Sequence, residues 1–199
     1  MKRIVTVVLL AMCWTAFAYA GDGALSKPGV LGEETIFLTE KLSTKYDNII
    51  IRDFSIDGAE IVSMDKDEQA KLKEIKSDIV KTLSESIVSH VKNDTKFARV
   101  TTKGTSSGRT VILEGKFTKF NAGQGAAKVF LGWMAPESAK TNISVSGRLV
   151  DARSGRELAK FSDTRSGHEG STIGFVGLVF KIQAKDEGEE IAKFIEKLY

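Results

Sequence analysis

Cysteine is almost absent from this chain of 199 residues, and its single cysteine, Cys13, lies near the N-terminus. One cysteine forms no internal disulfide and supplies no cysteine-based metal site. Histidine is nearly as scarce: the two residues are His90 and His168, and no His-x-x-x-His pair exists. Two histidines without carboxylates at helical or turn spacing do not suit a zinc site. The sequence therefore predicts no metal and no other cofactor.

Long apolar runs and an excess of one charge are also missing. A transmembrane helix takes about 20 apolar residues, and no segment in the body of the chain reaches that length without a charge. The formal net charge is +3, and without Lys2 and Arg3 it falls by these two charges to +1. A near-neutral chain with scattered lysines and arginines has no electrostatic footprint for nucleic acid. We expect no transmembrane segment in the mature chain and no nucleic-acid partner, and the oligomeric state stays open.

Residues 1–20 have the pattern of a bacterial secretory signal peptide. Lys2 and Arg3 precede a short apolar run, and the last three residues, Ala-Tyr-Ala, form a small-x-small cleavage site. We expect cleavage after Ala20 and export to the periplasm. Lipidation of Cys13 is the alternative, which would place the protein at the outer membrane. A methionine precedes this cysteine, where lipoprotein signals have a small residue, so cleavage after Ala20 is favoured.

The rest of the chain divides into an arm and one domain. Residues 21–47 are rich in glycine and have few periodic apolar positions, which predicts an extended N-terminal arm or linker with a short strand at 35–38. Residues 48–199 are numerous enough to bury a sizeable core. We expect them to form a single domain.

The clearest element is a long amphipathic helix from about residue 65 to residue 92. Apolar side chains recur in it every three or four residues, at Leu72, Ile75, Ile79, Leu83 and Ile87. Acidic residues fill its first turn, and His90 and Lys92 lie in its last turn, which suits the helix dipole at both ends. We therefore interpret His90 as part of the helix end and not as a ligand.

Strand-like runs surround this helix, and a second helix ends the chain. Alternation and β-branched residues predict strands at 48–54, 97–101, 110–120, 142–150 and 156–164. Residues 104–108 suggest a hairpin loop, and residues 151–155 a tight turn with Gly155 at positive φ. The order β-α-β-β-β-β-α predicts an α+β domain with a mainly antiparallel sheet and the long and C-terminal helices on one face.

Three motifs in the second half of the chain carry a family resemblance. They are Leu113-Glu114-Gly115-Lys116-Phe117, the loop Val129-Phe130-Leu131-Gly132-Trp133, and the strand and turn from Gly147 to Leu158. Over residues 111–199 the chain resembles the bacterial domain-of-unknown-function family 4410, and residues 49–54 and the long helix fit the family's first half more loosely. The family has no established activity. The resemblance therefore implies an exported envelope protein and no particular chemistry.

A serine-hydrolase pattern is present but lacks its context. Gly104-Thr105-Ser106-Ser107-Gly108 matches Gly-x-Ser-x-Gly, and Asp163 and His168 follow in the order such enzymes use. The pattern requires a strand that turns sharply into a helix, whereas another strand is expected from Thr110. A serine hydrolase is therefore only a third hypothesis, and we predict that the protein is not an enzyme.

Two further motifs fit ligand-binding loops poorly. Residues 65–68 could begin a calcium loop, but Ala70 and Lys76 stand where an EF-hand needs glycine and glutamate. Residues 123–128 lack the third glycine and the following serine or threonine of a nucleotide loop. We interpret the first motif as a helix start and the second as a connection between strands.

Two glycine-rich segments, residues 121–139 and residues 167–180, are unusually apolar for connections. Loop backbone is hard to satisfy when buried, so these side chains either cover the open end of the sheet or form an exposed contact patch. The candidate partner-contact residues are Phe130, Leu131, Trp133, Met134, Ile173, Phe175, Val176 and Leu178.

The sequence favours a non-enzymatic envelope protein that acts through contacts, as an interaction protein or as an accessory protein of assembly or transport. Its expected partner is an envelope protein or a lipid surface. The alternative is a periplasmic binding module that holds a small apolar ligand between the sheet and the two glycine-rich loops.

Overall fold

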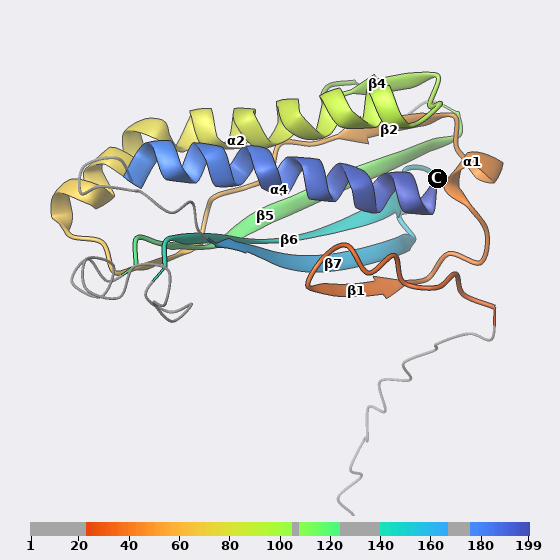
Figure 1. The fold of residues 1–199 in the computed structure, drawn as a ribbon. Helices are drawn as coiled ribbons and strands as arrows, with labels where there is room; N and C mark the ends of the chain where they lie inside the picture. Colours follow the sequence, from red (N-terminus) through yellow and green to blue (C-terminus); the bar gives the residue numbers. More distant parts are fainter. Residues whose placement is uncertain (1–22, 105–107, 124–139, 167–175) are drawn as a thin grey trace, which may run out of the picture.

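A mixed sheet with two long helices on one face forms the described part of the molecule (Figure 1). The computed structural model describes residues 23–104, 108–123, 140–166 and 176–199. The strands are β1 (Glu33–Ile36), β2 (Asn48–Ile51), β3 (Glu60–Val62), β4 (Arg99–Thr101), β5 (Thr110–Asn121), β6 (Asn142–Asp151) and β7 (Glu157–Ser166). The helices are α1 (Leu42–Lys45), α2 (Lys66–Asp94) and α4 (Val176–Leu198). The expected α+β class is confirmed.

The sheet is antiparallel on one side and parallel on the other. Its strand order is β1-β7-β6-β5-β2-β4, and β3 pairs with β5 further along that strand. The ladders that join β1, β7, β6 and β5 are antiparallel. Those that join β2 to β4, β2 to β5 and β3 to β5 are parallel. Most of the paired residues are thus antiparallel, as the sequence predicts. The parallel part of the sheet is not predicted by the sequence.

Residues 104–108 do not connect a hairpin, so this prediction is wrong. β4 and β5 lie on opposite sides of β2 and both run parallel to it, with Asn48 opposite Arg99 on one side and Thr110 on the other. Glycine and serine indicate that the chain turns, but they do not determine which strand edge it pairs with afterwards. The next tight turn is as expected, because Gly155 has φ +70° between β6 and β7.

α2 begins where its sequence predicts. The Asp65 carboxylate accepts a hydrogen bond from the Glu68 backbone N–H at 2.8 Å, and the Glu68 carboxylate accepts one from the Asp65 N–H at 3.0 Å. This reciprocal capping box satisfies two of the free donors at the helix start. The expected helix at 65–92 is confirmed and continues to Asp94. His90 lies near its end, with ring Nδ1 2.9 Å from the Ser86 carbonyl oxygen.

α2 and α4 lie side by side and run in the same direction (Figure 1). Gly177 of α4 faces Ile75 of α2, and Gly188 faces Ser86 further along both helices. A Cβ at either glycine would lie 2.6 Å from the facing side chain. The close approach of the two helices therefore depends on these two positions having no side chain.

The segment before β2 packs against the same core. Leu31, Ile36, Leu38, Leu42 and Tyr46 are all buried in the main cluster. β1 pairs with β7 and begins at Glu33, two residues before the strand expected at 35–38. The buried Glu34 carboxylate accepts hydrogen bonds at 2.8 Å from the backbone N–H groups of residues 29, 30 and 31. This side chain holds the preceding loop in place.

The two faces of the sheet differ in what covers them. Val111, Leu113 and Phe117 of β5 pack into the main core beneath the helices. Successive side chains of a strand alternate between faces, so Glu114 and Lys116 point to the other face. That face carries a small apolar cluster of Ile50, Ile112 and Val150. We call it the open face, because no described helix lies over it (Figure 1).

Candidate functional site

Most of the candidate contact residues lie outside the described residues. This applies to Phe130, Leu131, Trp133, Met134, Ile173 and Phe175. Val176 is the first residue of α4, and Leu178 lies in its first turn. Leu178 is 53% exposed. The last two candidates thus belong to a helix and not to the glycine-rich connection in which the sequence places them.

The strand register brings the ends of both apolar segments together. The first segment leaves β5 after Asn121 and enters β6 at Asn142, and the second leaves β7 after Ser166. Asn142 lies opposite Asn121 on one side and opposite Ser166 on the other. We call this end of the sheet, together with the start of α4, the contact end.

One more exposed apolar side chain, which is not among the candidate contact residues, lies at the contact end. Ile61 of β3 is 44% exposed and pairs with Phe120, next to the last residue of β5. Its strand is short and carries no clear alternation, so no signal in the sequence distinguishes this isoleucine from a core residue. Ile61 and Leu178 are the described apolar side chains that the contact end presents to solvent.

Aromatic rings fill the space between the sheet and α4 beneath the contact end. The ring centroids of Phe117 and Phe120 are 5.2 Å apart, and those of Phe120 and Phe180 are 5.3 Å apart. All three side chains are fully buried. The Gln183 side-chain amide donates to the Thr141 carbonyl oxygen at 2.8 Å, which ties α4 to the start of β6. This part of the core is therefore closely packed.

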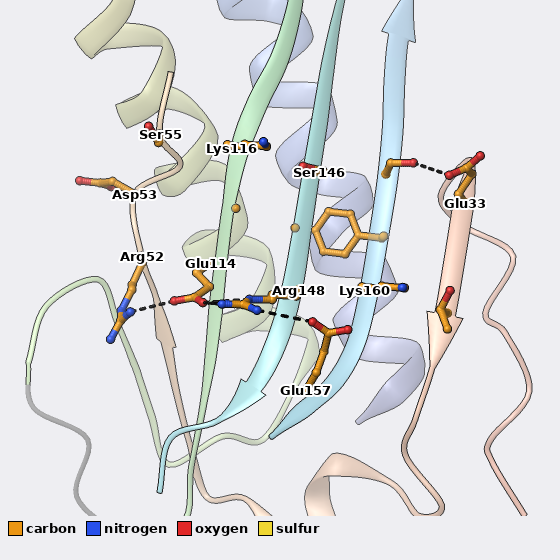
Figure 2. Close-up of a pocket in the computed structure, with 15 residues that line it drawn as sticks. Glu33, Arg52, Asp53, Ser55, Glu114, Lys116, Ser146, Arg148, Glu157 and Lys160 are labelled. Atoms are coloured by element: carbon orange, nitrogen blue, oxygen red, sulfur yellow. Dashed lines mark hydrogen bonds and ion pairs between the residues drawn. The ribbon is translucent and has the colours of Figure 1, made fainter. Parts of the chain in front are cut away.

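A groove of about 690 Å³ crosses the open face (Figure 2). Side chains from β1, β5, β6, β7 and the segment after β2 line it. A row of alternating charges runs across its floor. Glu114 contacts Arg52 at 2.8 Å and Arg148 at 2.7 Å, and Arg148 also lies 3.6 Å from Glu157. The hydrogen bond to Glu114 raises the pKa of Arg148.

Two glycines lie opposite each other in the middle of this groove. Gly115 of β5 pairs with Gly147 of β6. A Cβ at Gly115 would lie 2.4 Å from the ring of Phe54, and one at Gly147 would lie 2.5 Å from the ring of Phe161. Both rings belong to the main core. The glycines are therefore required because core aromatic rings pack directly on the strand backbone.

A second, partly buried charged cluster lies on the helix face, between β7 and α4. Arg165 lies 2.8 Å from Asp163, 3.1 Å from Glu187 and 3.9 Å from Glu190. Asp163 also accepts a hydrogen bond at 2.8 Å from the backbone N–H of Gly32. Sequence alternation contains a signal for this cluster, since residues 159, 161, 163 and 165 share a face and two of them are charged.

Glu187 is the most perturbed acid among the described residues. Its side chain is fully buried. Burial, and then the negative charge of Asp163, raise the pKa of Glu187 to about 8, although Arg165 opposes this shift. A buried carboxyl group with such a pKa holds its proton at neutral pH.

A third polar group lies near α1, at the other end of the sheet. The Tyr46 hydroxyl donates to Asp151 at 2.9 Å. Burial and this hydrogen bond raise the pKa of Tyr46 to about 12. The backbone N–H of Ser154 is the main cause that lowers the pKa of Asp151 to about 2. Asp151 thus stabilises the β6–β7 turn and shows no feature of a catalytic acid.

The described residues nearest to the candidate hydrolase serine and histidine lie at opposite ends of β5. Ser106 and His168 are outside the described residues. The residues that flank Ser106 precede β5, whereas Ser166 lies beside the far end of that strand. β5 is 12 residues long, or about 36 Å at roughly 3.3 Å per residue. The remaining candidate, Asp163, is paired with Arg165.

The described residues contain no group of three or more histidine, cysteine, aspartate or glutamate side chains suited to a metal ion. Asp65 and Glu68 cap α2, as the helix-start interpretation predicts. The segment 124–128 of the weak nucleotide-loop motif lies outside the described residues. Among the described helices, none has the length and apolar character to cross a bilayer.

Several solved structures resemble this fold at low sequence identity. PelC from Paraburkholderia phytofirmans, a dodecamer, is 10% identical over 80% of this chain and 95% of its own, with a TM-score of 0.44. Protein XCC0632 of Xanthomonas campestris, from family DUF330, is 11% identical over 77% and 84% of the two chains, with a TM-score of 0.47. A candidate lipoprotein from Caulobacter crescentus is 12% identical over 78% and 90%, with a TM-score of 0.40. TM-scores this low carry no inference about assembly or function.

The sequence itself matches one family model, and no curated protein matches it. The model, described as a domain of unknown function, DUF4410, covers residues 49–171. This range runs from β2 through β7, ends before α4, and includes the paired glycines and the Glu114–Arg148 ion pair. The chain therefore belongs to the DUF4410 family.

Proposed function

We propose that this protein is an exported envelope protein that acts by contacting a partner protein through the contact end. The observation that carries the proposal is the strand register. It brings the ends of two apolar, glycine-rich segments to adjacent positions at Asn121, Asn142 and Ser166. The exposed side chains of Ile61 and Leu178 lie at the same end. Apolar side chains gathered from separate segments are typical of a protein contact surface.

Export is supported by the signal-peptide pattern of residues 1–20. The intact mass of the protein isolated from cell envelopes tests it. A mature chain that begins at Gly21 is the expected result and indicates a periplasmic protein. A chain that begins at an acylated Cys13 would instead indicate a protein anchored to a membrane. An uncleaved chain in the cytoplasm contradicts the proposal.

Capture of partners from cell envelopes tests the contact end directly. We expect Leu178→Asp, Trp133→Asp and Phe175→Asp to lose a partner that the wild type retains, because each places a charge in the proposed apolar surface. Phe37→Asp is the matched control: Phe37 is also large, apolar and 39% exposed, but it follows β1 at the opposite end of the sheet.

The comparison is valid only if all four variants fold, which circular dichroism and thermal melting check. The proposal requires the three contact-end variants to lose the same protein that the Phe37→Asp control retains. Equal capture by every folded variant contradicts it. Retention on lipid vesicles that is lost in the same three variants would point to a lipid surface and would overturn the choice of a protein partner.

Binding of a small apolar ligand is the alternative, and the described residues offer less support for it. The space between the sheet and α4 near the contact end is occupied by the rings of Phe117, Phe120 and Phe180. A ligand would have to lie outside this packed region. Denaturation of protein purified from envelopes, followed by mass spectrometry of the extract, tests this alternative. A stoichiometric small molecule would support it.

A further inference from the structure

The Asp163–Arg165–Glu187 cluster has more buried acid than base. Two carboxyl groups face one guanidinium, and the third acid that reaches Arg165, Glu190, is partly exposed. Glu187 is fully buried on α4, and the Asp163 side chain is nearly so on β7. Two buried carboxylates beside one cation leave a net negative charge in a region with little solvent, which is costly.

Two oxygen atoms in the cluster lack a hydrogen-bond partner. Within the described residues, Asp163 Oδ2 and Glu187 Oε1 are both buried and accept no hydrogen bond. Asp163 Oδ2 lies 2.8 Å from Arg165 in an ion pair. One proton on this pair of acids would neutralise the excess charge and supply a donor to a group that otherwise has none.

We propose that Asp163 and Glu187 bind one shared proton, and that its loss weakens the attachment of α4 to β7. The groups that face Glu187 are Asp163 and Arg165 from β7, and Glu190 reaches the same arginine from α4. From the segment before β1, the backbone N–H of Gly32 reaches Asp163. The shared proton thus lies where α4, β7 and the segment before β1 meet.

The position of the pair links this proton to the contact end. Arg165 lies at the end of β7, directly before the second apolar segment, and that segment leads into α4. Weaker attachment of α4 would change how the exposed Leu178 is presented to a partner. This regulatory role rests on the function proposed above, whereas proton binding by the pair does not.

Hydrogen exchange of the α4 amides at several pH values tests the proton directly, on the protein alone. After correction for the intrinsic exchange rate, we expect the opening of α4 to increase by up to about tenfold per pH unit between roughly pH 5 and 8. Glu187→Gln should make the opening independent of pH in this range. Glu190→Gln is the matched control, because Glu190 lies three residues further along α4 and is partly exposed, and it should behave as the wild type.

An opening of α4 that does not vary with pH in the wild type overturns the proposal, and so does a pH dependence that Glu187→Gln retains. If that variant does not fold, the carboxyl ¹³C shift of Glu187 in the wild type is decisive. A midpoint near 8 is expected, and one near 4.5 contradicts the shared proton.

Capture of the partner at pH 6 and at pH 9 then tests the link to the contact end. If the opening of α4 shows no pH effect, the contact end still stands as a proposal. If Leu178→Asp does not reduce capture, only the proposed contact end is ruled out.

Discussion

Two arginines on opposite faces of the same sheet form similar ion pairs in different surroundings. Arg148 on the open face contacts Glu114 and Glu157, and its side chain is 53% exposed. Arg165 on the helix face contacts Asp163, Glu187 and Glu190, and its side chain is 28% exposed. The first cluster adds Arg52 and so balances its charges. The second has one arginine for three acids.

This difference shows what solvent does to an ion pair. On the open face, water stabilises each charge whether or not it is paired, so the pairs contribute little. On the helix face, water is largely excluded, and an unpaired charge is strongly unfavourable. The stability of the cluster around Glu187 therefore depends on Arg165 and on the bound proton. The charged row on the open face needs no such compensation.

The largest expected effect comes from removing the partly buried arginine, Arg165. Arg165→Met leaves Asp163 and Glu187 without their cation, and we expect the free energy of unfolding to fall by about 3–5 kcal/mol. The matched variant Arg148→Met on the open face should lose about 1 kcal/mol or less. Urea denaturation of both variants measures the difference. Equal losses would show that the two faces do not differ as described.

A smaller effect is expected from pH. Glu187 has a pKa of about 8 in the folded protein against an ordinary value of 4.5, so the folded state binds more protons than the unfolded state between these values. Stability therefore falls as pH rises through this window, by about 2–3 kcal/mol between pH 6 and 9. Urea denaturation at each pH measures this fall. The fall should be absent in Glu187→Gln, and a fall that remains there would assign it to other groups.

The next effect separates the two faces at adjacent residues of one strand. Gly115→Val places methyl groups against the Phe54 ring on the helix face, and we expect a loss of about 1–3 kcal/mol from overpacking. Lys116→Val points to the open face and should change stability by less than about 0.5 kcal/mol. Thermal melting compares the two. A tolerated Gly115→Val would contradict the close packing of Phe54 on β5.

The smallest effect concerns the exposed pair itself. A double-mutant cycle with Glu114→Gln and Arg148→Met should give a coupling energy of about 0.2–1 kcal/mol, which decreases as salt concentration rises. Urea denaturation of the four proteins at low and high salt measures it. A coupling of several kcal/mol, insensitive to salt, would indicate that the open face is covered by a part of the protein or by a partner.

Local signals explain which parts of the fold the sequence predicts well. The capping residues and the apolar stripe of α2 lie within a few residues of one another, so the helix is recognisable at both ends. The β6–β7 turn is similarly local, since Asp151 and Gly155 determine it. The glycines in the family motifs also have a physical explanation, because the rings of Phe54 and Phe161 pack directly against Gly115 and Gly147.

Features that depend on distant partners are missed. Arg99 and Thr110 belong to strands that flank β2, and nothing in their own sequence distinguishes this arrangement from a hairpin. Ile61 is exposed although its residue type predicts burial. Asp163 and Glu187 are acids that a sequence places on the surface, and only the packing of α4 on β7 buries them.

The sequence by itself determined the α+β class, the positions of the long helix and most strands, the family, and the expectation of export. These properties depend on periodicity, capping and motifs that act over short stretches of chain. Only the tertiary structure decided which strands are neighbours, that the strand ends flanking the two apolar segments lie together, and that Arg165 is shared by three acids. Such properties arise from contacts between residues far apart in the chain, and burial then determines how strongly each charge counts.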